Sequence, residues 1–177
     1  MHFRDSSGTA PTRHGGRQLG ARPLADALQQ TRQRTLGLID AWAQARPDLA
    51  VPCEPELNRP LWELGHIGWF QEWWIGRNEQ RYRGTECDPL HARKPSRLPG
   101  ADSLYDSSAV AHAQRWELQL PDLATTRDYL DAVLADSLAY LSEAGSDDRA
   151  LYFWRLVLFH EQMHNEAMAY MAQSQGI

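Results

Sequence analysis

The sequence predicts an all-α protein, a four-helix bundle in which one long connection joins the second helix to the third. Three observations predict this fold. Four stretches carry apolar residues at spacings of three and four, as amphipathic helices do. The run over residues 79–120 is broken by proline and glycine and has no period. Two histidines four residues apart lie in the apolar stripe of the last stretch, and bundle cores build metal sites from such side chains.

The composition is that of one soluble domain. The chain has 177 residues, which is long enough to bury a core. Its net charge of −5 gives no electrostatic footprint for nucleic acid, so no nucleic-acid partner is expected. No apolar run approaches the roughly 20 residues of a membrane span, and the N-terminus lacks the apolar segment of a signal peptide. We therefore expect a cytoplasmic protein without a membrane partner, and the sequence leaves a homodimer open.

The chain begins with a predicted tail. Residues 1–20 are polar, glycine-rich and aperiodic, so we expect them to be disordered and residues 21–177 to form one metal-binding helical domain. The first helix is predicted over residues 23–45, where apolar residues share one face, and Pro47 ends it.

A second helix is predicted to open near Asn58, with Pro60 in its first turn. His66 lies on its aromatic face, in phase with several tryptophans that we interpret mainly as core. Gly65 and Gly68 flank His66, although each costs about 1 kcal/mol relative to alanine in a helix interior. Close approach of another helix or of a ligand would explain both glycines.

The third and fourth helices follow a long connection. Residues 79–120 are expected to form a run without regular structure, and such runs tend to be functional. Asp122 or Thr125 is expected to cap the third helix and Gly145 to end it. Ser146 is the expected cap of the fourth helix.

The fourth helix carries the most strongly patterned run, residues 151–173. His160 and His164 share its apolar face, and two ring nitrogens at this spacing can reach one ion at ~2.1 Å. The alternative is a pair of core histidines, each hydrogen-bonded to a backbone carbonyl or a carboxylate. Because each buried neutral ring needs a partner, two rings in one stripe favour a metal.

The string HEQMH, from His160 to His164, matches the HExxH helix of zinc proteases, in which the glutamate is the general base. Only 13 residues follow His164, so unless the chain is a fragment the third ligand must come from upstream, and His66 is the best candidate. Three neutral imidazoles suit a Zn²⁺ Lewis acid or an Fe²⁺ that binds a thiolate and O₂. Glu161 and Glu166 turn off the ligand face, so we expect supporting or surface roles.

The run PLWELGHIGWF at residues 60–70, followed by HEQMHNE at residues 160–166, resembles the N-terminal DinB-like domain of the ergothioneine-biosynthesis sulfoxide synthases. It is most similar to their selenium-using relatives, the selenoneine synthases, over residues 20–175. The resemblance implies an iron-dependent oxidoreductase whose mononuclear non-haem Fe²⁺ is held by His66, His160 and His164. It also implies an O₂-dependent joining of sulfur or selenium to the imidazole ring of hercynine, which is trimethylhistidine.

Two departures from the family bear on substrate residues. Family members usually have glutamine before the last ligand, near the trimethylammonium group, where this chain has Met163. They tend to carry paired arginines for the carboxylates of γ-glutamylcysteine, where this chain has Arg115 and, in the other place, His112. The resemblance therefore assigns Met163, Arg115 and His112 to substrate binding. One lost arginine suits a donor without those carboxylates, such as a selenosugar, better than a low-molecular-weight thiol.

A third departure concerns length. Family members continue into a second domain, similar to formylglycine-generating enzyme, which supplies much of the substrate pocket and a catalytic tyrosine. This chain stops at Ile177, so we expect a fragment, or a domain that acts with a separate partner, and no catalytic residue is assigned. Two alternatives stay open. Stand-alone DinB-like proteins resemble metal-dependent thiol transferases that act on bacillithiol, mycothiol or glutathione, and a non-catalytic bundle would pack its histidines in the core.

Overall fold

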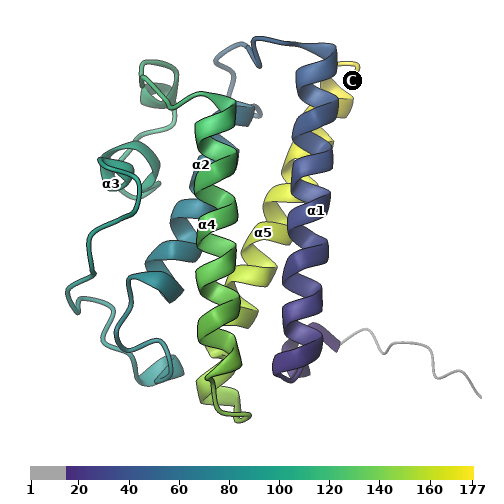
Figure 1. Ribbon diagram of the computed structural model, residues 1–177. Helices are drawn as coiled ribbons and strands as arrows, with labels where there is room; N and C mark the ends of the chain where they lie inside the picture. Colours follow the sequence, from purple (N-terminus) through teal and green to yellow (C-terminus); the bar gives the residue numbers. More distant parts are fainter. Residues whose placement is uncertain (1–14) are drawn as a thin grey trace, which may run out of the picture.

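The computed structural model describes residues 15–177, and within them it consists of helices and their connections. The four bundle helices run side by side, and a crossover joins the second to the third along one side of the bundle (Figure 1). The predicted all-α bundle with one long crossover is therefore confirmed. The bundle helices are α1 (Ala21–Ala45), α2 (Pro60–Gln71), α4 (Leu123–Ser142) and α5 (Asp148–Ser174).

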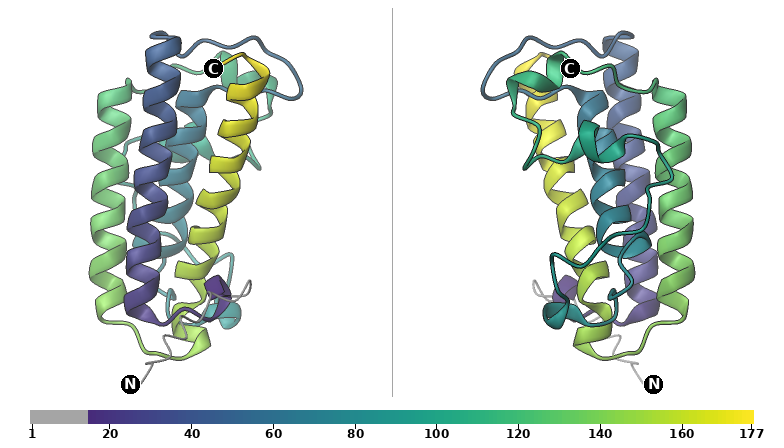
Figure 2. Two further views of the ribbon diagram at one scale, coloured as in Figure 1. Left: turned by 90° about the vertical axis from the view of Figure 1, so that its right-hand side faces the viewer. Right: turned by 90° about the vertical axis from the view of Figure 1, so that its left-hand side faces the viewer.

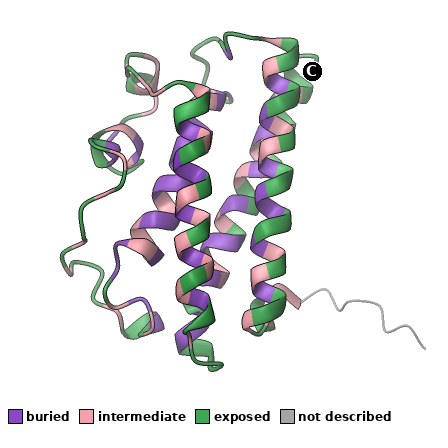
Figure 3. Ribbon diagram, viewed as in Figure 1, coloured by how far each residue is buried: buried purple, intermediate pink, exposed green. Residues whose placement is uncertain are grey.

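Each helix turns its apolar face toward the middle of the bundle. Helix α1 packs against α5, and α2 packs against α4. Figure 3 shows the buried residues on the inner sides of the helices and the exposed residues outside. Within residues 15–177, no helix is both long enough and apolar enough to cross a membrane. The core has two main clusters, one around Trp42, Leu64 and Met168 and the other around Leu28, Ile75 and Trp154.

The predicted tail, residues 1–20, lies mostly outside the described residues. Its last part is folded, because Gly15–Gln18 form a short 3₁₀ helix, η1, and α1 begins at Ala21. Arg155 of α5 holds this segment by donating to the Leu19 carbonyl oxygen at 3.0 Å. Residues 15–20 therefore have a defined structure in which an anchoring contact comes from the far end of the chain, and the disorder of the tail stays a prediction.

Carboxylates set the starts of the last two helices. Asp122 Oδ1 accepts a hydrogen bond from Thr125 N at 2.7 Å, so one of the two predicted caps of α4 is confirmed. The cap predicted for α5 is wrong, because Asp147 rather than Ser146 takes that place and its Oδ1 accepts from Ala150 N at 3.0 Å. A carboxylate accepts this bond and also interacts favourably with the positive end of the helix dipole.

The crossover contains more regular structure than was predicted for residues 79–120. In the right-hand view of Figure 2 it passes in front of α2, and α2 holds it in place. Trp62 Nε1 donates to the Leu104 carbonyl at 2.8 Å, and Trp69 Nε1 donates to an Asp102 carboxylate oxygen at 2.7 Å. Pieces this short produce no helical period in a sequence, which is why they were missed. They are η3 (Gly84–Glu86), α3 (Ala101–Tyr105) and η4 (Ala113–Trp116).

The two glycines beside His66 allow close approach, as predicted. A Cβ atom on Gly65 would lie 2.2 Å from Cζ of Tyr105, so the tyrosine ring sits directly on the helix backbone. A Cβ atom on Gly68 would lie 3.0 Å from side-chain atoms of Tyr129 and Leu130 on α4. The absence of a side chain therefore lets the crossover pack closely against α2 at Gly65, and lets α4 pack closely against it at Gly68.

Candidate metal centre

The structure brings together the three histidines that the sequence predicts as metal ligands. His66 comes from α2, and His160 and His164 come from adjacent turns of α5. One ring nitrogen from each of the three lies within 4.8 Å of the others. The Nε2 atoms of His160 and His164 are 3.2 Å apart. Two ligands of a tetrahedral ion at ~2.0–2.1 Å lie roughly 3.3 Å from each other, so this pair fits a shared metal.

The second nitrogen of two of these rings is engaged elsewhere. His66 Nδ1 lies 2.8 Å from the Tyr105 carbonyl oxygen, and because a carbonyl only accepts, the proton is on Nδ1. His164 Nδ1 is hydrogen-bonded to the Glu63 carboxylate. Both rings are therefore held as tautomers whose Nε2 carries a lone pair. This arrangement is the one that metal-ligating histidines usually adopt.

Glu63 is a candidate site residue that the sequence reasoning missed. Its side chain is buried, with one carboxylate oxygen bonded to His164 and the other to the Asn58 amide. Burial alone would raise the pKa of Glu63, but the hydrogen bonds with His164 and Asn58 hold that pKa below its usual value. The carboxylate is therefore an anion that orients the His164 ring. Glu63 precedes His66 by three residues on an apolar helix, so the two share one helix face. This spacing could have predicted that Glu63 is buried near the histidines.

Replacing Glu63 by glutamine is expected to weaken metal affinity by roughly 10–100-fold, because the neutral amide no longer fixes and polarises His164. Competition between the protein and a chromophoric chelator for added metal measures this affinity. Glu79→Gln is the matched control, since Glu79 lies at the surface and pairs with Lys94. Equal affinities for the Glu63 variant and the control would contradict an orienting role for Glu63.

Aromatic rings stack on His66 and His160, and burial keeps these two imidazoles neutral. The Phe70 ring stacks on His160 with centroids 3.6 Å apart, and the Trp62 ring stacks on His66 at 4.8 Å. Burial, with the neighbouring His164 adding to it, lowers the pKa of His66 to about 4 and that of His160 to about 2. Both imidazoles are therefore uncharged near neutral pH, which is the form that binds a metal ion.

Glu161 does not occupy the place that the zinc-protease motif would give it. Its carboxylate is buried and accepts from Arg32 Nε at 2.8 Å and from Thr35 Oγ1 at 2.6 Å, both on α1. The expected surface role is wrong for Glu161, although Glu166 is exposed. A glutamate committed to this ion pair cannot serve as the general base of a zinc protease.

The three predicted substrate residues lie in different surroundings. The Arg115 guanidinium lies over the Trp62 ring, with Cζ 3.8 Å from the ring centroid, and Trp62 stacks on His66. His112 Nε2 donates to the Leu57 carbonyl at 2.7 Å, so its ring is engaged with backbone. The Met163 side chain is exposed on α5. Of the three residues, Arg115 is therefore the one that is connected to a candidate ligand, His66, through the Trp62 ring.

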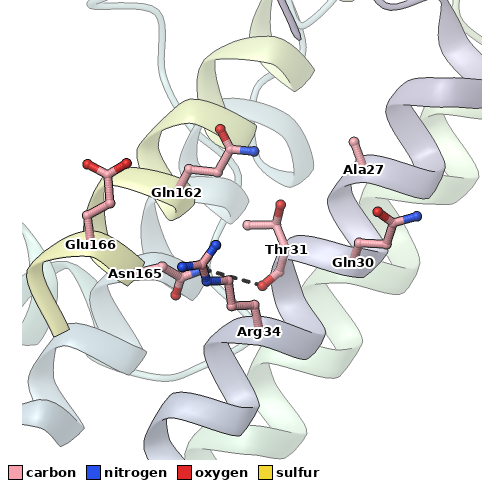
Figure 4. Close-up of a pocket in the computed structure, with 7 residues that line it drawn as sticks. All are labelled: Ala27, Gln30, Thr31, Arg34, Gln162, Asn165 and Glu166. Carbon is pink, nitrogen blue, oxygen red and sulfur yellow. Dashed lines mark hydrogen bonds between the residues drawn. The ribbon is translucent and has the colours of Figure 1, made fainter. Parts of the chain in front are cut away.

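A cleft of about 530 Å³ lies between α1 and α5, away from the histidines. Figure 4 shows Asn165 reaching across it, where its amide donates to the Thr31 carbonyl at 3.4 Å. The α5 residues of this cleft point roughly half a helical turn away from His160 and His164. The cleft is therefore separate from the candidate metal centre.

Three curated proteins named hercynine oxygenase are similar to this chain, whereas no protein-family model matches it. The identity is 33% over 149 residues for the Mycobacterium tuberculosis protein and 32% over 146 residues for that of Mycolicibacterium smegmatis. It is 31% over 146 residues for that of Mycolicibacterium thermoresistibile. Each alignment covers 82% of this chain, which spans 29–31% of the length of these relatives. The similarity supports the relationship to ergothioneine-type sulfoxide synthases that the motifs indicated.

Proposed function

We propose that this chain is the DinB-like metal-binding domain of a non-haem iron, O₂-dependent enzyme that joins sulfur or selenium to the imidazole ring of hercynine. One observation carries the proposal. Three histidines meet in a chain that is similar over 82% of its length to proteins named hercynine oxygenase. The relatives are about three times as long as this chain. That this chain takes part in the complete reaction is therefore a proposal.

The ion would be held by His66, His160 and His164. Three neutral ligands leave it its full positive charge, and the name oxygenase favours Fe²⁺ over Zn²⁺. When bound there, Fe²⁺ would bind and activate O₂, and the sulfur or selenium donor and hercynine would supply the electrons for its reduction. The chain itself orients the rings, through the Tyr105 carbonyl and the Glu63 carboxylate. The aromatic rings stacked on His66 and His160 keep water away from two of the three ligands.

The selenium donor is favoured by the surroundings of Arg115 and His112. Arg115 is the cation beside the histidines, because it stacks on Trp62. His112, which stands where the family tends to have a second arginine, is engaged with the Leu57 carbonyl. A donor with one anionic group or none, such as a selenosugar, suits this arrangement better than a dipeptide thiol with two carboxylates.

Hercynine binding beside the metal tests the proposal without requiring turnover. The protein is loaded anaerobically with Fe²⁺ for metal analysis and with Co²⁺ as an optical probe. We expect hercynine to change the Co²⁺ absorption spectrum and histidine, which lacks the three methyl groups, to change it much less. Loading without any response to hercynine would contradict the proposal. Zn²⁺-dependent consumption of a low-molecular-weight thiol would instead support a thiol transferase.

A further inference from the structure

We propose that Tyr105 is a positioning residue for His66, and that it acts through the packing of its side chain on Gly65. The backbone carbonyl of Tyr105 lies 2.8 Å from His66 Nδ1, and the ring of the same residue determines where that carbonyl lies. The missing side chain of Gly65 provides the space for the ring. This inference rests on the proposed function, because it takes His66 as a ligand of the metal.

The short helix α3 ends against α2. Carbonyl groups in the last turn of a helix have no partner within that helix. The Leu104 carbonyl accepts from Trp62 Nε1 at 2.8 Å, and the Tyr105 carbonyl accepts from His66 Nδ1 at the same distance. Trp62 and His66 are four residues apart, so one face of α2 supplies both donors. The end of α3 is therefore bonded directly to a candidate metal ligand.

The Tyr105 side chain packs on the backbone of α2. It is fully buried, and a Cβ atom on Gly65 would collide with its ring and hydroxyl. Trp62 packs near the same ring, with centroids 6.5 Å apart. Because protein interiors are close-packed, a ring enclosed in this way has little room to move. Ring and carbonyl belong to one residue, so the position of the ring sets that of the carbonyl.

A second bond holds the first turn of α3 against α2. Asp102 Oδ1 accepts from Trp69 Nε1 at 2.7 Å. Trp69 follows His66 by three residues on α2, whereas Trp62 precedes it by four. Helix α3 is therefore bonded to α2 on both sides of His66. With both ends attached, the Tyr105 carbonyl has little freedom to leave the His66 ring.

The position of this carbonyl matters because a histidine binds a metal ion through a nitrogen that carries no proton. A neutral imidazole has two tautomers, and the carbonyl selects the one with its proton on Nδ1. In His66 this leaves the Nε2 lone pair for the ion. If the Tyr105 carbonyl were displaced, the proton would lie on Nε2 in part of the molecules and the ring could turn. Both changes would weaken metal binding.

Nitrogen NMR of the metal-free protein tests the proposal, because a protonated ring nitrogen and one with a lone pair have well-separated ¹⁵N shifts. We expect His66 to carry its proton on Nδ1 in nearly all molecules of the unchanged protein. Tyr105→Ala and Gly65→Ala are each expected to produce a population with the proton on Nε2. An unchanged His66 tautomer in the folded variants would overturn the proposal.

Zn²⁺ affinity is the second measurement, made by competition with a chromophoric chelator. Gly65→Ala is expected to weaken binding by roughly 10–100-fold, as the loss of a group that orients a metal ligand usually does. Gly68→Ala is the matched control, because a Cβ atom there would meet Tyr129 and Leu130 of α4 at 3.0 Å. The control is expected to bind Zn²⁺ as the unchanged protein does. Equal losses in both variants would overturn the proposal, since crowding of α2 would then explain them.

Tyr105→Phe separates the ring from the hydroxyl. This variant keeps the ring on Gly65 and the backbone carbonyl at His66, so the His66 tautomer and the Zn²⁺ affinity should both be unchanged. A loss as large as that in Tyr105→Ala would assign the effect to the hydroxyl and overturn the role of ring packing.

A double variant shows whether Gly65→Ala acts through Tyr105. In protein that already carries Tyr105→Ala, adding Gly65→Ala should cause little further loss of Zn²⁺ affinity, because the ring that the new methyl group would meet is gone. Fully additive losses would contradict a path through Tyr105. Circular dichroism establishes that each variant is folded, and Tyr105→Leu, which keeps an apolar side chain, replaces Tyr105→Ala if that variant is not.

The outcome is separate from that of the proposed function. The tautomer is measured without metal, and the affinity is measured with Zn²⁺ and without hercynine. If the Co²⁺ spectrum responds to hercynine but Gly65→Ala changes neither tautomer nor affinity, the role of Tyr105 falls and the proposed function stands. If Gly65→Ala changes both while the Co²⁺ spectrum ignores hercynine, the role of Tyr105 stands and the proposed function falls.

Discussion

Replacing His66 by alanine is expected to abolish tight metal binding while leaving the helical bundle folded. His66 is the one α2 residue among the three histidines that converge in the described structure. Without it, His160 and His164 offer two ligands from a single helix. The loss should exceed the roughly 10–100-fold that follows from removing a residue that only orients a ligand. Elemental analysis of protein purified anaerobically without an affinity tag measures the metal content.

His91→Ala is the matched control, because this imidazole lies at the surface, 3.9 Å from Glu79. Circular dichroism on both variants separates metal loss from unfolding, since His66→Ala also removes a buried ring and its bond to the Tyr105 carbonyl. If the His66 variant kept its full metal content, the three-histidine site would be wrong. That result would favour a metal site formed by His160 and His164 of α5 without His66.

Replacing Glu161 by glutamine is expected to lower the free energy of unfolding by about 3–5 kcal/mol, because it leaves the Arg32 charge buried without its partner. Arg32 is buried and also donates to the Leu130 carbonyl and to Gln71 Oε1, both at 2.7 Å. The Arg32 side chain, which comes from α1, is therefore hydrogen-bonded to each of the other three bundle helices, α2, α4 and α5. Urea denaturation followed by circular dichroism measures the change.

Two further variants test whether the unpaired Arg32 charge causes the loss of stability in Glu161→Gln. Glu166→Gln, on the exposed side of the same helix, should alter the free energy of unfolding by no more than about 0.5 kcal/mol. Combining Arg32→Met with Glu161→Leu should recover much of the lost stability, since apolar replacements of a buried ion pair are often neutral or stabilising. An unchanged stability in Glu161→Gln, accompanied by loss of activity, would restore the general-base interpretation of Glu161.

The features that the sequence predicted correctly depend on neighbours within a turn or two. The spacing of four residues places His160 and His164 on one helix face wherever that helix packs. Asp122 caps α4 through a bond to Thr125, three residues away. The structure also brings His66 to the pair, as the sequence predicts. That these histidines bind a metal, and which metal, stays a prediction.

The errors concern groups whose partners are distant in the sequence. Glu161 was expected at the surface or in a supporting role, yet it pairs with Arg32, 129 positions away. Glu63 received no role, although it bonds His164 across 101 positions. A periodic pattern indicates that a polar residue is buried without indicating what satisfies it.

By itself the sequence determined the all-α class, the helices and the pair of histidines on one face, because periodicity and helix caps act over short distances. Only the tertiary structure decided which nitrogen of His66 is free and what Glu161 does. The Tyr105 carbonyl and the Arg32 guanidinium settle those two points. The physical reason is that a buried polar group must find a partner, and the packing of distant segments decides which one.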